Sequence, residues 1–192
     1  MTRAASILCD FVTHAPQSII PSLPQICTSS LTIASSSSDD ALLQSDFYLM
    51  NVIVQLLGSH PTTNMVVNGG EYAVHVQQVT DKYFASNLVN EEEYTHCTCN
   101  AISLYVSLLN FFGTTALQQV ATAMLTVVGK ALPAKDDEVE ARRIHDVILE
   151  WVTNHHPVLQ ALPGSETGFL TCVKAAGPSC LSEEAKQYLA NM

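Results

Sequence analysis

The sequence is 192 residues long, which is enough to bury a core in one or two domains. Apolar residues make up 47% of it and charged residues only 14%, against about 25% in a typical globular domain. A net charge of −10 repels phosphate backbones, and Arg142 and Arg143 are the only adjacent basic pair, so the composition argues against a nucleic-acid partner. Basic proteins are the partners that an acidic surface favours.

The longest dense apolar stretch is Ile102–Phe112, which polar residues interrupt. It is shorter than the ~18 residues that a membrane span needs, so no membrane segment is predicted. The N-terminal apolar run reaches Asp10 too early for a signal peptide. The six cysteines are therefore expected to be reduced and mostly buried, in a cytoplasmic or nuclear protein.

Hydrophobic spacing predicts helices along nearly the whole chain, beginning with Arg3–His14. A break at Pro16 follows, and then a second helix over Gln17–Ala34, in which Pro24 should start or kink the regular part. The run Ser35–Ser38 is the one low-complexity stretch and is predicted to be a flexible link.

The clearest helical pattern covers Asp39–His60, where Asp39 and Asp40 supply acceptors at the start and Gly58 and Pro61 are expected to end the helix. Apolar residues recur there at steps of three and four. They are Leu43, Phe47, Met50, Val54 and Leu57, with Leu49, Ile53 and Leu56 beside them. A face this wide must be buried on two sides.

The middle of the chain predicts three more helices. One runs over Glu71–Leu88 after a turn at Asn68–Gly70. The next begins with the carboxylates of Glu91–Glu93, which favour the helix dipole, and continues to Phe112, where Gly113 ends it. The third is capped by Thr114 or Thr115 and ends at Pro133.

The C-terminal third begins with an amphipathic helix over Lys135–Asn154. Pro157 is expected to end this helix, and Trp151 lies on its core-facing side. Two weaker helices are predicted near Glu166–Ala176 and Ser182–Asn191. The first helices of successive pairs start near residues 3, 39, 91 and 136, so their starts are about 36, 52 and 45 residues apart. HEAT and armadillo repeats have a period of about 40–47 residues, which these separations scatter around. The predicted fold is therefore all-α, with antiparallel helix pairs stacked as a short α-solenoid in a single domain over residues 1–192. A compact bundle of helices is the alternative.

The segment Ala4–Ile33 has an apolar first helix, a proline-containing turn and a second helix that carries Pro21 and Pro24. In this it resembles a HEAT repeat of the karyopherin-β superfamily of importins and exportins. The helix pair formed by Glu91–Phe112 and Thr115–Leu132 resembles the same repeats. Karyopherin-β proteins are also acidic, as this chain is. The resemblance implies a protein-binding scaffold related to, or a fragment of, a nuclear transport receptor. That family has no compact motif from which binding residues could be transferred.

The cluster His96-Cys97-x-Cys99 contains zinc-ligand chemistry, which His155, His156, Cys172 and Cys180 could complete. However, Cys97 and Cys99 would point about 200° apart around a helix, one toward the core and one away from it. Inert packing is therefore favoured over a metal site. His96 and Cys97 are neighbours on a helix and do not face each other, and no nucleophile elbow or phosphate loop occurs. We predict neither an enzyme nor a bound cofactor.

Two acidic clusters are the candidate partner-binding residues. The first comprises Glu91, Glu92 and Glu93, and the second comprises Asp136, Asp137 and Glu138. Each would also serve as the first turn of a helix, and Arg142 and Arg143 can pair with acidic side chains one turn away. The predicted function is a non-catalytic helical-repeat scaffold that binds basic segments of other proteins. The alternative is a compact helical subunit of a larger complex.

Overall fold

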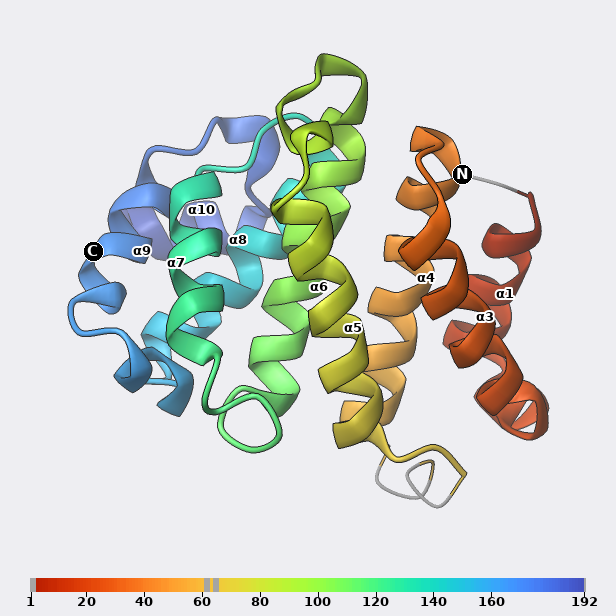
Figure 1. The fold of residues 1–192 in the computed structure, drawn as a ribbon. Coiled ribbons are helices and arrows are strands. Elements are labelled where there is room, and N and C mark those ends of the chain that lie inside the picture. Colours follow the sequence, from red (N-terminus) through yellow and green to blue (C-terminus); the bar gives the residue numbers. More distant parts are fainter. Residues whose placement is uncertain (1–2, 61–62, 64–65, 192) are drawn as a thin grey trace.

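The computed structural model describes residues 3–60, 63 and 66–191. Within these residues every regular element is helical and no strand occurs, which confirms the all-α prediction. The chain runs from its N-terminal helices at one side of the molecule to its C-terminal helices at the other (Figure 1).

The first helix is α1 (Arg3–His14), with the predicted bounds. A short α2 (Pro16–Ile19) and a 3-10 turn η1 (Ile20–Ser22) lead into α3 (Leu23–Ser36). Pro24 lies in the first turn of α3 and starts the regular helix, because an N–H group there would lack an intrahelical partner in any case.

The predicted link over residues 35–38 is shorter than expected, since α3 continues through Ser36. The hydroxyls of Ser35 and Ser36 donate to backbone carbonyls one turn back, at 2.6 and 2.8 Å. These bonds satisfy the small polar side chains inside the helix. Only residues 37–39 then separate α3 from the next helix.

The two central helices are α4 (Asp40–Ser59) and α6 (Thr95–Phe112). Asp39 caps α4 as predicted, because its Oδ1 accepts a 2.8 Å bond from the Leu42 amide. The predicted apolar face of α4 is buried, including the residues that widen it. α6 is buried along almost its whole length. Its buried residues are Cys97, Cys99–Leu109 and Phe112.

The prediction that Gly58 ends α4 is wrong, because the helix continues through Ser59. The predicted stop at Pro61 lies outside the described residues. Gly58 instead allows α6 to approach: a Cβ atom there would lie 2.3 Å from Cγ of Phe111.

We therefore expect Gly58→Ala to destabilise the fold by up to about 2 kcal/mol, because the cost of overpacking exceeds what alanine gains in a helix. Urea unfolding measures this. Gly168→Ala in α9 (Ser165–Lys174) is the matched control, since nothing lies within 4 Å of a Cβ atom there and a gain of about 0.5–1 kcal/mol is expected. Equal gains at the two glycines would contradict the packing role of Gly58.

α5 spans Gly69–Phe84, so Gly69 and Gly70 are its first residues and not a free turn. Asn68 caps it by accepting from the Glu71 amide at 3.2 Å. The helix ends four residues before the predicted Leu88, and two 3-10 turns follow, η3 (Asn87–Asn90) and η4 (Glu92–Tyr94).

The prediction that Glu91–Glu93 form the first turn of the next α-helix is therefore wrong, since α6 begins at Thr95. Tyr94 supplies the reason. Its side chain is buried, and its hydroxyl donates to the Ser38 carbonyl in the connection between α3 and α4. This anchor draws the acidic segment against the preceding helices before the regular helix starts.

The remaining helices are α7 (Ala121–Ala131), α8 (Glu138–Thr153), α9 and α10 (Glu183–Ala190). α7 starts later than the predicted cap at Thr114 or Thr115, because Leu117 is buried in the turn that follows α6. α8 begins three residues after the predicted Lys135, because Asp137 caps it, and it ends at Thr153, before the predicted stop at Pro157. Pro157 instead opens the 3-10 turn η5 (Pro157–Ala161). Trp151 is 1% exposed, which confirms its core position.

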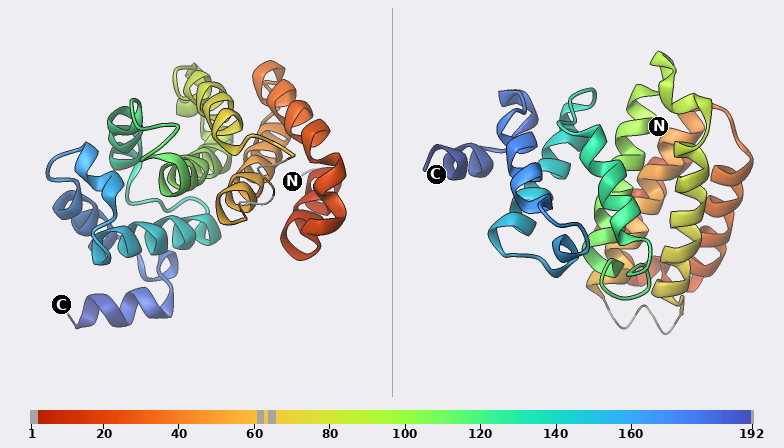
Figure 2. Two further views of the ribbon diagram at one scale, coloured as in Figure 1. Left: turned by 90° about the horizontal axis from the view of Figure 1, so that it is seen from below. Right: turned by 60° about the vertical axis from the view of Figure 1, so that its left-hand side comes forward.

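The helices lie in two rows. α1, α4, α6 and α8 form one row in which each contacts the next. α3 and α5 contact each other, as do α7 and α9, and they lie along one side of that row (Figure 2, left). α4 is the one helix of the described chain that is long and apolar enough to cross a membrane, but 67% of that stretch is buried against other helices, as in a core helix.

A chain of polar side chains crosses the interface of α4 and α6. Asn51 donates to Ser103 at 3.0 Å, and Gln55 donates to Asn51 at 3.1 Å and to Ser107 at 3.3 Å. Asn51 and Ser103 are each 1% exposed. These bonds satisfy polar groups that would otherwise be costly to bury.

Candidate functional site

The two predicted acidic clusters meet at one cavity. It has a volume of about 340 Å³ and lies between the η3–η4 segment, the start of α6 and the segment before α8. Glu91 and Glu92 line it from one side and Asp136 from the other. Cys99, Ile102 and Ala134 are apolar parts of its lining. The fold thus brings together carboxylates from two distant parts of the sequence.

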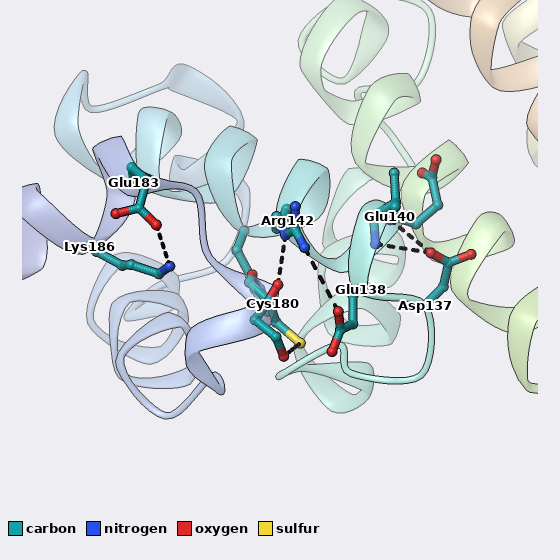
Figure 3. A network of polar contacts seen from close by, with 10 residues as sticks. Asp137, Glu138, Glu140, Arg142, Cys180, Glu183 and Lys186 are labelled. Atoms are coloured by element: carbon teal, nitrogen blue, oxygen red, sulfur yellow. Dashed lines mark hydrogen bonds and ion pairs between the residues drawn. The ribbon is translucent and has the colours of Figure 1, made fainter.

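Asp137, the middle residue of the second cluster, makes contacts within the fold. Its Oδ1 accepts from the amides of Val139 at 3.1 Å and Glu140 at 3.2 Å, so it caps α8 (Figure 3). Its Oδ2 lies 3.7 Å from Nδ1 of His96, at the start of α6. Asp137 therefore orients the two helix starts relative to each other more than it faces solvent.

Glu138 and Glu140 have basic neighbours on their own helix, as the sequence predicted. Glu138 lies 3.8 Å from Arg142, and Glu140 lies 3.3 Å from Arg143 (Figure 3 shows the first of these pairs). Arg142 also donates to the Ser179 carbonyl at 2.7 Å, which ties the C-terminal segment to α8. The charge of Glu138 is thus partly compensated.

The other acidic residues of the two clusters have no basic side chain within ion-pair distance in the described chain. Glu91, Glu92, Glu93 and Asp136 are exposed, and within the described chain none of them forms an ion pair. Lys135 is the basic residue in the cavity lining. The candidate partner-binding surface, which we call the acidic pocket, is therefore formed by Glu91, Glu92 and Asp136, with Glu93 nearby in sequence.

Cys99, in the wall of the acidic pocket, has a buried thiol. Burial raises the pKa of its thiol to about 12, and the nearby carboxylates of Asp137, Glu140 and Asp136 contribute to that rise. A thiol with so high a pKa stays protonated at neutral pH and reacts poorly. The acidic groups of this pocket are therefore its carboxylates.

Both Cys97 and Cys99 are buried, so the prediction that one of them would face away from the core is wrong. α6 is packed on several sides: Cys97 lies near Tyr83 of α5, and Cys99 lies near Asp137 before α8. His155 and His156 are engaged elsewhere, with Glu166 and with the Trp151 ring. No group of three or more potential metal ligands occurs among the described residues.

Sequence reasoning missed a second cavity, which lies between α1, α3 and α4 and includes the buried carboxyl of Asp46. A signal for it was present. Asp46 stands three residues before Leu49 and seven before Ile53, which places it on the apolar face of its helix. Aspartate is rarely found fully buried unless its carboxyl has a partner.

Neither the family models, the curated proteins nor the solved structures yield a significant match to this chain.

Proposed function

We propose that the protein is a non-catalytic helical-repeat scaffold that binds a basic segment of a partner protein at the acidic pocket. One observation carries the proposal: Glu91, Glu92 and Asp136 line the same cavity although they come from two separate segments. A partner side chain that entered there would meet carboxylates from two sides. Such convergence favours lysine or arginine over neutral groups.

The helix arrangement supports the scaffold part of the proposal. Successive pairs α3–α4, α5–α6 and α8–α9 are in contact, and the row α1, α4, α6, α8 is continuous. A HEAT-type α-solenoid places its helices in this way, with each pair packed on the next. The resemblance of the first helix pair to karyopherin-β repeats points in the same direction and suggests a cytoplasmic or nuclear scaffold.

Electrostatics supports the choice of partner. A single exposed ion pair contributes only about 0.2–1 kcal/mol, so one carboxylate would not make a binding site. Three carboxylates around one cavity act on the same ligand, and the net charge of −10 adds long-range attraction for a basic segment. Binding of this kind is expected to weaken with added salt.

We expect the triple variant Glu91→Gln/Glu92→Gln/Asp136→Asn to bind a fluorescent lysine- and arginine-rich peptide about tenfold more weakly than the unchanged protein at low salt. Fluorescence anisotropy over a salt series measures the affinity and its salt dependence. The difference between the two proteins should shrink as salt is added, because screening removes the attraction that the variant lacks.

The matched control is Asp10→Asn/Glu71→Gln/Glu184→Gln, which makes the same change of net charge at exposed positions on three different helices away from the pocket. It should lose about twofold or less, through long-range attraction alone. If both triple variants lose the same affinity, the peptide reads only net charge and the acidic pocket is not its site.

A further inference from the structure

The cavity between α1, α3 and α4 is separate from the acidic pocket and has a volume of about 350 Å³. Most of its lining is apolar. The aliphatic side chains are those of Leu8, Ile26, Ile33, Leu42 and Leu49. Small-molecule sites in proteins have this size and character, with a few polar groups that fix the orientation of the ligand.

Asp46 is the only charged residue among the described residues that line this cavity. It is 3% exposed, and its Oδ2 atom has no hydrogen-bond partner in the described structure. Burial raises the pKa of this carboxyl to about 8, against a smaller opposing effect of a backbone hydrogen bond from Ala34. A buried carboxyl without a partner is costly, and leucine or asparagine would fill the same position at lower cost.

The other polar side chains nearby do not account for Asp46. The Ser30 hydroxyl donates to the Cys27 carbonyl at 3.0 Å and lies 3.2 Å from the Tyr72 hydroxyl. Ser45 donates to the Ala41 carbonyl at 2.7 Å. These contacts are internal to the fold. Gln25 and Ser29 also line the cavity but are exposed, so among its polar residues Asp46 is the buried one with an atom that has no partner in the described structure.

We propose that this cavity binds a small hydrophobic amine, whose ammonium group pairs with the Asp46 carboxylate while its apolar body lies against Leu8, Ile26 and Leu49. Charge complementarity selects the amine. An ammonium group supplies the countercharge and the N–H donors that a buried carboxylate lacks, whereas a carboxylic acid ligand would add a second negative charge.

Binding an ammonium ion requires Asp46 to lose its proton. The O–H bond of the carboxyl breaks, the proton passes to the buffer, and an N–H···O hydrogen bond to the ligand forms in its place. Affinity should therefore rise by about tenfold for each pH unit from pH 6 to pH 8 and level off above that. A neutral ligand that accepts a hydrogen bond from the protonated carboxyl would show the opposite trend.

The buried thiol and phenol groups of the surrounding helices do not lose their protons in this range. The buried titratable groups on them are Cys9 on α1, Cys27 on α3, Tyr72 and Tyr83 on α5, and Cys97, Cys99 and Tyr105 on α6. Burial raises the pKa of every one of them, so they stay neutral up to pH 9. α3 has no charged residue, and the charged and histidine side chains of α1, α5 and α6 are exposed.

The test compares two fluorescent ligands of the same shape, naphthylmethylamine and naphthylmethanol, by titration of the full chain. The amine is expected to bind about 10- to 100-fold more tightly at pH 8, the usual range for a hydrogen bond to a buried charge. Asp46→Asn should remove that preference and leave the affinity for the alcohol within about twofold. Calorimetry in buffers of different ionisation enthalpy should show the release of one proton per amine bound at pH 6.5.

Ser29→Trp serves as a second variant, because Ser29 is an exposed residue at the rim of the cavity and its replacement by tryptophan fills the space. It should abolish binding of both ligands with an unchanged circular-dichroism spectrum. Equal binding of amine and alcohol, retention of the amine preference in Asp46→Asn, absence of binding by either ligand, or affinity for the amine that falls between pH 6 and pH 8 would each overturn the proposal.

Discussion

Asp46→Asn is expected to stabilise the fold by up to about 5 kcal/mol at pH 8 and to have little effect near pH 4. The cause is the carboxyl that burial keeps protonated, with a pKa of about 8 in the folded protein against 3.8 for an aspartate in water. Between these two values the folded state holds a proton that the unfolded state has lost. Stability therefore falls as the pH rises from about 4 to about 8 and then stays level.

Urea unfolding of the two proteins at pH values from 4 to 9 measures the effect. The difference in unfolding free energy should grow with a slope of up to about 1.4 kcal/mol per pH unit, which corresponds to one proton. Asp10→Asn, at an exposed aspartate on α1, is the control and should change the unfolding free energy by less than about 0.5 kcal/mol. Parallel curves for the unchanged protein and Asp46→Asn would show that Asp46 is ionised in the folded state.

Trp151→Ala is expected to cost about 3–5 kcal/mol of stability. The ring is 1% exposed, it stacks against His156 with ring centroids 5.7 Å apart, and its Nε1 donates to Asn110 on α6 at 2.7 Å. Truncation leaves a large cavity between α8 and α6 and removes the hydrogen bond that joins them.

Chemical denaturation of two further variants separates the apolar contact from the hydrogen bond and provides a control. Trp151→Phe keeps most of the apolar contact and should cost about 1–2 kcal/mol, the loss of the hydrogen bond and of part of the ring. Tyr188→Ala on α10 removes an aromatic side chain that is 37% exposed and should cost about 1 kcal/mol or less. A cost below 1 kcal/mol for Trp151→Ala would contradict a structural role for this residue.

The helices were most predictable where the apolar spacing was continuous. The bounds of α1 and the burial of Leu43, Phe47 and Trp151 followed from spacing alone, because a helix has to bury its apolar face. The boundaries that failed depend on contacts between distant residues. Gly58 looks like a helix stop until Phe111 packs on it, and the start of α6 depends on the hydroxyl of Tyr94 reaching Ser38.

The sequence indicates the acidic residues of the candidate site, but not that they meet at one cavity. Glu91 and Asp136 were recognised as members of acidic clusters, yet only the fold places them around one cavity. The burial of both Cys97 and Cys99 was missed because sequence spacing gives directions around a helix and not the number of neighbours. Asp46 could have been found from its position among apolar residues, which is the signal of a buried carboxyl.

The hydrogen-bonded chain of Asn51, Gln55, Ser103 and Ser107 has a consequence for how the molecule can deform. If α4 slid past α6 by one helical turn, amides and hydroxyls would face aliphatic side chains and lose their partners at a cost of about 1–3 kcal/mol each. Leucine-on-leucine contacts elsewhere impose no such penalty for sliding. These hydrogen bonds therefore hold α4 and α6 in one register more firmly than apolar contacts alone would.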